Sequence, residues 1–473
     1  MNAFLIPDLL LLLTPFLVIA IRIFTRNSKP AFIFANLSFL VIFVFLNRLV
    51  LGDEPHIFFS TWKVDRFGVL MREILILGAF LGVWFAKDYF DHRADHKSKL
   101  TQMAEYIAAL MFATFGGFAV LSATELLTLF LGLEIATVPM YALTAWNKTD
   151  PNGSEAGTKF ILMGSVATAF ELFGLSYLYG FAGTLELSLI ADAVAQNMHS
   201  PLLWISVLFL ICGIGFKLTL FPFYTWAPDV YDGAPTPTTA VLSVTSKLVA
   251  VIFLMVLIFG PFAAIHSELI PFLSLLAAIT LFVGNLGALK QNRLRRFMAY
   301  SSISQAGYIL IALIGPESLA RGAVAYYFVV YTIANYLAFF IFGVIGRNRS
   351  ETFESLRGLS KQSPVLAVAL AVAAFSLAGI PPLAGFLGKF FLFYSAAEAK
   401  GYALILFAVL NNVIALYYYI QLIKAAWVDE PETEPEPLAI TLRQKVVIIV
   451  LMIGTLTIGV LPFLNTNIFR IVG

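Results

Sequence analysis

Four ionisable residues lie inside long apolar runs of this 473-residue chain. They are Glu134 in TELLTLFLGLEIATVPMYALTAW, Lys217 in ICGIGFKLTLFPFYTW, Lys247 in TTAVLSVTSKLVAVIFL and Lys389 in GIPPLAGFLGKFFLF. An ionisable side chain at the centre of a bilayer costs roughly 2.5–3.5 kcal/mol on insertion scales. Side chains that are so costly to place there are candidates for ion or proton handling.

Proton transfer is the chemistry that these residue types suit. Desolvation disfavours the charged form of a buried lysine, whereas a nearby carboxylate favours it. A lysine whose glutamate partner approaches or withdraws can therefore take up and release a proton near neutral pH. We expect Glu134 and Lys217 to form such a pair, with Lys247 as the central relay and Lys389 toward the exit. The alternative for each residue is a structural ion pair or a charge that reaches the membrane surface.

The remainder of the chain has the composition of a membrane protein. Hydrophobic residues make up 60% of it and charged residues 12%, whereas soluble domains contain roughly 25% charged residues. The apolar runs predict an all-α polytopic membrane protein with about fourteen transmembrane helices, most of them near the ~20 residues that a bilayer requires. The predicted spans are 4–22, 30–51, 67–86, 104–121, 124–146, 157–180, 202–225, 236–260, 267–289, 297–315, 322–346, 363–394, 402–426 and 445–468. The stretch 184–196 is predicted to lie at the interface, and 429–438 to be a solvated acidic loop.

Prolines interrupt the seventh and twelfth predicted spans close to their lysines. Pro222 follows Lys217 by five residues, and Pro382 precedes Lys389 by seven. A proline removes a helix hydrogen bond, and freed backbone at membrane depth is tolerated only where protein or water satisfies it. Broken helices at corresponding places point to inverted repeats around an ion site, although a plain kink is the alternative for each helix.

We therefore predict two inverted five-helix repeats, made of spans 4–8 and 9–13, with helices 7 and 12 broken. The expected organisation is three N-terminal helices, a first repeat, a second repeat, and an acidic loop with a C-terminal helix, over residues 1–100, 101–262, 263–428 and 429–473.

Lysine and arginine are distributed unevenly between the two sets of predicted loops. Twenty of them lie on one side, and six, or seven with Arg72, lie on the side of the two termini. Cytoplasmic loops carry the excess of basic residues. The sequence therefore predicts a protein of the bacterial inner membrane with both termini in the periplasm.

Other polar residues receive no part in the predicted site. Glu171 is mid-span in ATAFELFGL without an evident partner, which favours a hydrogen-bonded structural carboxyl. Asp229 and Asp232 lie in the turn PDVYDGAPTP, where we expect them to be solvated or to cap a helix. His92 and His96 have i,i+4 spacing, but no third ligand is near, so no metal site is predicted.

The sequence contains none of the motifs that commonly hold a redox or nucleotide cofactor. Its single cysteine, Cys212, cannot supply the usual ligands of an iron–sulfur cluster. There is no GxGxxG, no P-loop, no CxxC and no mid-membrane histidine. We expect no cofactor in this chain and a lipid bilayer, not nucleic acid, around it. Moving one charge against 100 mV costs about 2.3 kcal/mol, which must come from a partner or another ion gradient.

At its motifs the sequence resembles the antiporter-like membrane subunits of bacterial NADH:quinone oxidoreductase, the respiratory complex I. The similar segments are FPFYTWAPDVYDGAPTPTTAVLSVTSKLVAVIF (221–253), NLGALKQNRLRRFMAYSSISQAGYIL (285–310), FSLAGIPPLAGFLGKFFLF (375–393) and NNVIALYYYIQLI (411–423). The turn PDVYDGAPTP and Lys389 resemble the subunit N branch of this family, because subunits M and L differ at the turn and M usually has glutamate in place of that lysine. The resemblance covers residues 100 to 425.

The resemblance implies a proton-translocating subunit (a translocase, EC 7.1.1.-) with no redox centre of its own. Glu134 and Lys217 would be the coupling pair, Lys247 the relay and Lys389 the outlet. Subunits M and K are the implied neighbours, together with L, J, A and H, in a complex whose other parts carry FMN, iron–sulfur clusters and quinone.

Two positions depart from the family pattern. Tyr224 and Gln305 stand where many relatives have histidine. Both side chains order water by hydrogen bonds but neither becomes a cation, so we predict a secondary polar path at these points and no histidine relay. Two other functions stay open: a subunit of an Mrp-type cation/proton antiporter, against which the PDVYDGAPTP turn argues, and a scaffold that has lost pumping.

Overall fold

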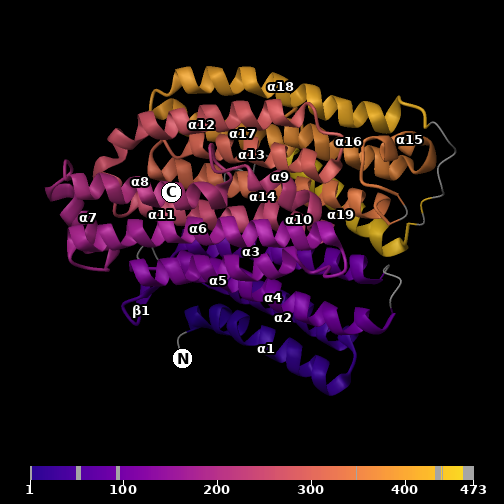
Figure 1. Cartoon of the computed structure of the whole chain (residues 1–473), viewed down its shortest axis with the longest axis horizontal. Coiled ribbons are helices and arrows are strands. Elements are labelled where there is room, and N and C mark those ends of the chain that lie inside the picture. Colours follow the sequence, from indigo (N-terminus) through magenta and orange to yellow (C-terminus); the bar gives the residue numbers. More distant parts are fainter. Residues whose placement is uncertain are drawn as a thin grey trace. The chain divides into compact units, whose positions relative to one another are not determined.

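The computed structural model of the chain is almost entirely helical (Figure 1). It describes residues 3–49, 55–91, 96–347, 349–431, 438 and 440–461, with the backbone alone over 96–101. Among these residues, twelve helices are long and apolar enough to cross a membrane, so the chain is a multi-pass membrane protein. The predicted helical class is confirmed, with one addition. A small antiparallel hairpin of β1 (His56–Phe58) and β2 (Trp62–Val64) lies within the predicted loop 52–66.

The helices divide into two compact units. The first comprises Met1–Leu218 and Gly233–Glu268. Its helices are a 3-10 turn (Ala3–Leu5), α1 (Ile6–Thr25), α2 (Ser28–Arg48), α3 (Arg66–Asp91), α4 (His96–Ser122), α5 (Leu126–Thr144), α6 (Pro151–Ala182), α7 (Leu187–Gln196), α8 (Pro201–Leu218), α10 (Thr236–Val241), a π-helical segment (Leu242–Ser246), α11 (Lys247–Phe259) and a 3-10 turn (Ala263–Ile265). The short α7 falls within the stretch predicted to lie at the interface.

The second unit comprises Thr219–Asp232 and Leu269–Gly473. Its helices are α9 (Trp226–Gly233), α12 (His266–Ala288), α13 (Leu294–Ala312), α14 (Glu317–Ile345), a 3-10 turn (Glu354–Leu356), α15 (Leu359–Gln362), α16 (Pro364–Ala378), α17 (Ala384–Glu398), α18 (Tyr402–Trp427) and α19 (Leu442–Val460). Helix α14 packs against α13, α16, α17 and α19, so it forms the centre of this unit.

Two predicted spans are not single apolar helices. The tenth corresponds to α13, which carries two arginines and several hydroxyl side chains, and the twelfth is divided into α16 and α17, both too short to cross alone. The total of fourteen spans, the inverted repeats and the four sequence segments stay predictions. Most of the predicted acidic loop, at 432–437 and 439, and the chain after 461 lie outside the described residues.

The seventh and twelfth spans are broken, as predicted. Helix α8 stops at Leu218 and α9 starts only at Trp226. In the second break, α16 ends at a left-handed residue, Gly379 with φ +82°, a conformation that glycine adopts without steric cost. Freed backbone finds partners: the N–H of Phe221 donates to the hydroxyl of Thr280 at 3.1 Å. Both interruptions are therefore accommodated inside protein, as membrane depth requires.

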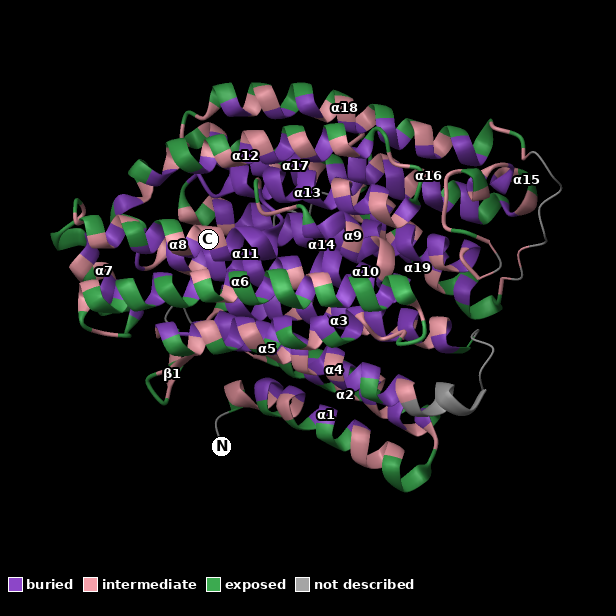
Figure 2. Cartoon of the chain, in the orientation of Figure 1, coloured by how far each residue is buried: buried purple, intermediate pink, exposed green. Residues whose placement is uncertain are grey.

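Burial separates inner from outer helices in each unit (Figure 2). In the first unit α4 and α11 are mostly buried, whereas α1, α2 and α6 expose apolar side chains such as Phe16 and Leu162. In the second unit α13 and α14 are buried, whereas α12 and α18 expose side chains such as Leu275 and Val413. Outward-facing apolar side chains of this kind suit lipid, not water, as the surrounding solvent.

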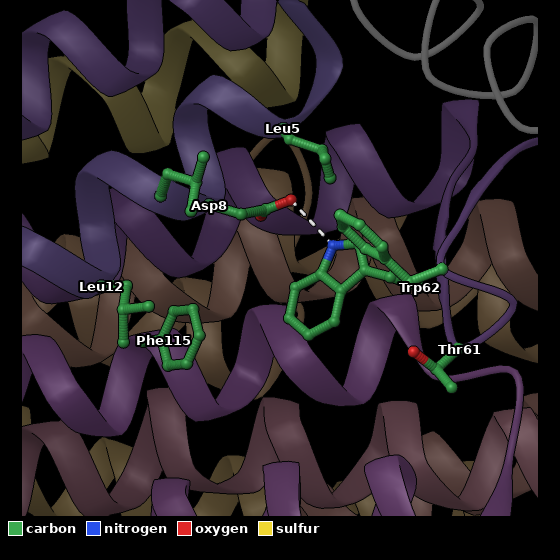
Figure 3. A pocket seen from close by; sticks show the side chains of 8 residues that line it. Leu5, Asp8, Leu12, Thr61, Trp62 and Phe115 are labelled. Atoms are coloured by element: carbon green, nitrogen blue, oxygen red, sulfur yellow. Dashed lines mark hydrogen bonds between the residues drawn. The ribbon is translucent and has the colours of Figure 1, made fainter. Parts of the chain in front are cut away.

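A buried ion pair ties the N-terminal helices of the first unit together. Arg72 of α3 is 1% exposed and donates from Nε to Oδ1 of Asp8 in α1 at 3.0 Å. Asp8 also accepts from Nε1 of Trp62 at 3.1 Å (Figure 3), and Arg72 donates to the hydroxyl of Ser122. The pair lies beside a cavity of about 200 Å³ lined mainly by apolar side chains of α1, the hairpin and Phe115. Arg72, placed at the edge of the third predicted span, thus lies inside α3 with a buried partner.

Candidate functional site

Glu134 and Lys217 are in direct contact. Glu134 lies on α5, and Lys217 lies in the last turn of α8. Nζ of Lys217 donates to Oε1 of Glu134 at 2.6 Å, and the two side chains are 3% and 19% exposed respectively. The structure thus forms the pair that the sequence predicted, with the short distance of a charge-assisted hydrogen bond. Its role in proton transfer stays a prediction.

Two threonines and a helix end complete the surroundings of this pair. The hydroxyl of Thr168 on α6 donates to the same Oε1 of Glu134 at 3.1 Å. The hydroxyl of Thr137 lies 3.4 Å from Nζ of Lys217. Because α8 stops one residue after Lys217, the amine lies at the negative end of the helix dipole, which stabilises a cation there.

Glu171 has a partner that was not evident in the sequence. Its carboxyl on α6 is 0% exposed, and Oε2 lies 3.2 Å from Nζ of Lys217. Lys217 therefore stands between carboxyl groups from α5 and α6. Spacing along the chain could not reveal this contact, because the three residues lie on three helices whose packing the sequence does not state. A carboxyl in the middle of an apolar span was the only available signal.

Glycines allow α6 and α8 to approach closely beside this site. A Cβ added to Gly213 of α8 would lie 2.2 Å from Cγ of Glu171 and 2.8 Å from the carbonyl oxygen of Ala167. A Cβ added to Gly174 of α6 would lie 2.8 Å from the backbone nitrogen of Leu210. Small residues of this kind are typical of close helix packing in membranes. The approach brings Glu171 within reach of Lys217.

Lys247 lies at a local irregularity of its helix. It is the first residue of α11, it follows the π-helical segment directly, and it is 2% exposed. Thr245 of that segment packs on α3 at Gly78, where an added Cβ would lie 2.8 Å from the threonine oxygen. Single π-helical turns inside α-helices occur frequently at functional sites. The predicted mid-span burial of Lys247 is confirmed, whereas its part as a relay stays a prediction.

Lys389 belongs to the second unit and has neutral partners. From α17 it donates to Oδ1 of Asn412 at 2.6 Å and to the carbonyl oxygen of Ala378 at 3.1 Å. Its Nζ lies 4.3 Å from the ring centroid of Tyr308, and the hydroxyl of Tyr308 donates to the same Oδ1 at 3.2 Å. Carbonyl oxygens, a phenol ring and a helix end all stabilise a positive charge.

Gln305 meets the same broken helix end. Its Nε2 donates to the carbonyl oxygen of Leu377 at 3.3 Å, and its Oε1 accepts from the hydroxyl of Tyr327. Leu377 and Ala378 are the last residues of α16, where backbone carbonyls lose their helical partners. The structure therefore brings two predicted residues, Gln305 and Lys389, to the end of α16.

Tyr224 lies in the turn between α8 and α9. Its half-buried ring stacks on Phe221, with ring centroids 6.5 Å apart. Its carbonyl oxygen accepts from the N–H of Ala227 at 3.0 Å. The secondary polar path predicted through this residue stays a prediction.

Asp229 and Asp232 form ion pairs, which the prediction of solvated or helix-capping side chains did not include. Asp229 pairs with Arg296 at 2.7 Å, and Asp232 pairs with Arg293 at 2.6 Å. Both arginines stand at the start of α13, where the helix dipole disfavours cations. The two aspartates lie in α9, where the sequence predicted a turn; they compensate those charges and hold α9 against α13.

We predicted no metal site at His92 and His96. His92 and the side chain of His96 lie outside the part of the chain that the structure describes. Within the described part of the chain, no three metal-binding side chains gather at one place.

Comparison with known proteins places the chain in a family. The family described as NADH:quinone oxidoreductase/Mrp antiporter, TM, matches residues 123–415, the stretch that carries all four predicted proton-transfer residues. The chain belongs to this family of multi-pass membrane proteins.

Within the family, the most similar relatives include proteins called NADH-quinone oxidoreductase subunit N. That of Moorella thermoacetica is 36% identical over 86% of this chain and 84% of its own. Subunit N 1 of Herpetosiphon aurantiacus is 34% identical over 97% of this chain and 94% of its own. Among solved structures, a chain of respiratory complex I from Thermus thermophilus has a TM-score of 0.81 at 28% identity, covering 99% of this chain and 100% of that one. A chain of the Mrp complex from Dietzia sp. has a TM-score of 0.85 at 18% identity, over 100% and 97%, which shows a shared fold alone.

Proposed function

We propose that this chain is the N-type membrane subunit of a bacterial NADH:quinone oxidoreductase and that it translocates protons while quinone is reduced elsewhere in the complex. The buried Glu134–Lys217 contact carries the proposal. An amine and a carboxyl 2.6 Å apart inside apolar helices form an acid–base pair whose protonation depends on the distance between its members. The family match and the subunit N relatives support the same function.

The pair acts as the coupling element. When Lys217 is held against Glu134, both charges are compensated and buried at modest cost. If a conformational or electrostatic change separates them, each becomes an uncompensated buried charge, and proton uptake by the carboxylate or release by the amine relieves it. Energy from quinone reduction, delivered through partner subunits, thereby becomes proton movement.

Lys247 and Lys389 extend the same chemistry. Lys247 is the relay, and its buried position next to a π-helical turn supports that role. Lys389 is the outlet, and its amine donates hydrogen bonds to the end of α16 and to Asn412. Gln305 and Tyr224 serve as neutral hydrogen-bonding groups where many relatives have histidine.

The chain works as one part of a translocase and holds no redox centre of its own. FMN, iron–sulfur clusters and quinone belong to other subunits, and the membrane neighbours are subunits M and K, with L, J, A and H in the same complex. The positive-inside bias supports a location in the bacterial inner membrane with periplasmic termini. Operation as an Mrp-type antiporter subunit would share this fold, but the similarity to the Mrp structure is 18% in sequence, below that of the subunit N relatives.

Removal of either member of the pair tests the proposal. Lys217→Ala and Glu134→Ala, introduced into the assembled complex, should each lower proton pumping and quinone-linked turnover in proteoliposomes. Co-purification provides the second arm, because the proposal predicts a large assembly with flavin and iron–sulfur subunits. Near wild-type pumping in both variants, or isolation with membrane subunits alone, would remove the proposed function.

A further inference from the structure

Glu171 is a buried ionisable residue that the proposed function leaves without a role. Its carboxyl lies midway along α6 at 0% exposure, with Oε2 3.2 Å from Nζ of Lys217. Among the described residues, no hydrogen-bond donor other than the amine of Lys217 reaches its oxygens. A buried carboxylate with so few donors is costly, whereas a protonated carboxyl carries no charge to desolvate.

With Lys217 held as an ammonium, the charges of the three side chains balance in only one composition. Glu134 and Glu171 face the same ammonium of Lys217 from two helices. If both carboxyls were ionised, the buried cluster would keep one net negative charge, and carboxyls that share a site hold one proton between them for this reason. The neutral cluster therefore contains one ammonium, one carboxylate and one protonated carboxyl, and its protons belong to the group as a whole.

We propose that Glu171 is a second proton-carrying residue of this site, and that Lys217 exchanges one carboxylate partner for the other as a proton passes through. This inference rests on the proposed function and deepens it. In the first state, Glu134 is ionised and bonded to Lys217, while Glu171 carries the proton. In the second state, the two carboxyls have exchanged their protonation and Lys217 is bonded to Glu171.

The step between the two states conserves charge. An incoming proton forms an O–H bond on Glu134, the O–H bond of Glu171 breaks, and its proton leaves the site. Lys217 keeps its own three protons and turns from the neutral carboxyl to the new carboxylate. One proton enters and one leaves, and the cluster has zero net charge before and after, so neither state buries an uncompensated ion.

The geometry corresponds to the first of these states. Glu134 has the shorter contact with Lys217, 2.6 Å against 3.2 Å for Glu171, and receives the hydroxyl of Thr168 as well. Of the two carboxyls, Glu134 is the partly exposed one, at 19%, whereas Glu171 is fully enclosed. In the proposed sequence of states the proton enters at Glu134, the less enclosed carboxyl, and Glu171 holds the proton farther inside.

Side-chain variants in the assembled complex, reconstituted in proteoliposomes, test the role of Glu171. Glu171→Gln keeps the shape of the side chain but cannot carry a proton. We expect it to lower the number of protons moved per quinone reduced to the value of Lys217→Ala. Glu171→Asp, which retains the acid, should recover most of the wild-type ratio. Glu186→Gln removes an exposed carboxyl of the same unit and should leave the ratio unchanged.

Infrared difference spectroscopy supplies a readout that a merely structural role would not change. The carbonyl band of a protonated carboxylic acid should be present in wild type and absent in Glu171→Gln. Loss of pumping in Glu171→Gln with that band retained, or equal losses in Glu171→Gln and Glu171→Asp, would overturn the inference. Wild-type pumping in Glu171→Gln, with pumping lost in Lys217→Ala and Glu134→Ala, would overturn it and leave the proposed function standing. Wild-type pumping in all three variants would remove the proposed function itself.

Discussion

A single methyl group at Gly213 should separate the carboxyl of Glu171 from its lysine. In Gly213→Ala the new Cβ would lie 2.2 Å from Cγ of Glu171 and 2.8 Å from a backbone oxygen of α6. Nonbonded carbon atoms settle about 3.5–4.0 Å apart, so α6 and α8 must part by more than about 1 Å. Lys217 stands one helical turn further along α8, on the same face as Gly213. Its 3.2 Å contact with Glu171 should then exceed the 4 Å limit of an ion pair.

The size of the effect follows from two known magnitudes. Overpacking of this kind costs about 1–3 kcal/mol, and replacing a helical glycine by alanine returns about 1 kcal/mol, so the fold should survive. Misplacing a reacting group by about 1 Å costs up to ~10²-fold in rate. We therefore expect an assembled complex whose proton-to-quinone ratio is strongly reduced, as measured by proton uptake in proteoliposomes.

Gly180→Ala is the matched control for this variant. Gly180 lies on α6, and a Cβ added there meets nothing within 4 Å, so pumping should be unchanged. Equal pumping by Gly213→Ala, Gly180→Ala and wild type would show that the close approach of α6 and α8 has no part in proton transfer. Equal impairment of both variants would point to a general effect of alanine in this unit, and would equally refute the reasoning.

Three further perturbations have defined outcomes. Removing one partner of the buried Asp8–Arg72 pair, by Asp8→Leu or Arg72→Met, should cost about 3–5 kcal/mol of stability in thermal unfolding. The double variant should recover most of that loss. If the two losses simply added in the double variant, the pairing would be contradicted. Asn412→Leu removes the oxygen that accepts a 2.6 Å hydrogen bond from Lys389. Because a hydrogen bond to a charged group is worth about 1.5–3 kcal/mol, proton pumping should fall roughly 10-fold or more. Pumping at the wild-type rate would argue against Lys389 as the outlet. The hydrogen bond from Lys361 lowers the pKa of the loop residue Glu430, so any stabilisation by this pair is present above the ordinary carboxyl pKa and is lost as pH falls through the lowered value. Because both side chains are exposed, that stabilisation is very small. Lys361→Ala should therefore leave the thermal midpoint at pH 7 nearly unchanged, and a clear shift would disprove this account.

The sequence predicted those parts of the structure that depend on composition and local chemistry. Apolar length located the helices, and Pro222 and Pro382 located the two interruptions, because a missing backbone donor acts where it occurs. The contact of Glu134 with Lys217 was predictable because a mid-membrane amine and a mid-membrane carboxyl are each costly alone and compensate each other in contact.

Contacts set by the packing of distant helices could not be predicted in the same way. Glu171 and Lys217 approach each other only because Gly213 and Gly174 allow close packing, and neither glycine is distinguished by its local sequence. The pairing of Arg72 with Asp8 was not predicted, because Asp8 lies two helices earlier in the chain. The aspartates of the PDVYDGAPTP segment pair with arginines more than sixty positions away in the sequence. Long-range pairing of this kind needs three-dimensional coordinates.

The neutral surroundings of Lys389 impose an electrical condition on that residue. Its contacts are an amide oxygen, a backbone carbonyl and a phenol face, none of which can gain or lose a proton near neutral pH in exchange for the one on the amine. Every protonation of Lys389 therefore changes the local charge by a full unit. Because the interior has a low dielectric constant, the electrostatic effect of that charge extends over a long distance. Protonation of this amine should change the electrostatic energy of any charged group nearby, and the protonation itself should depend on the membrane voltage.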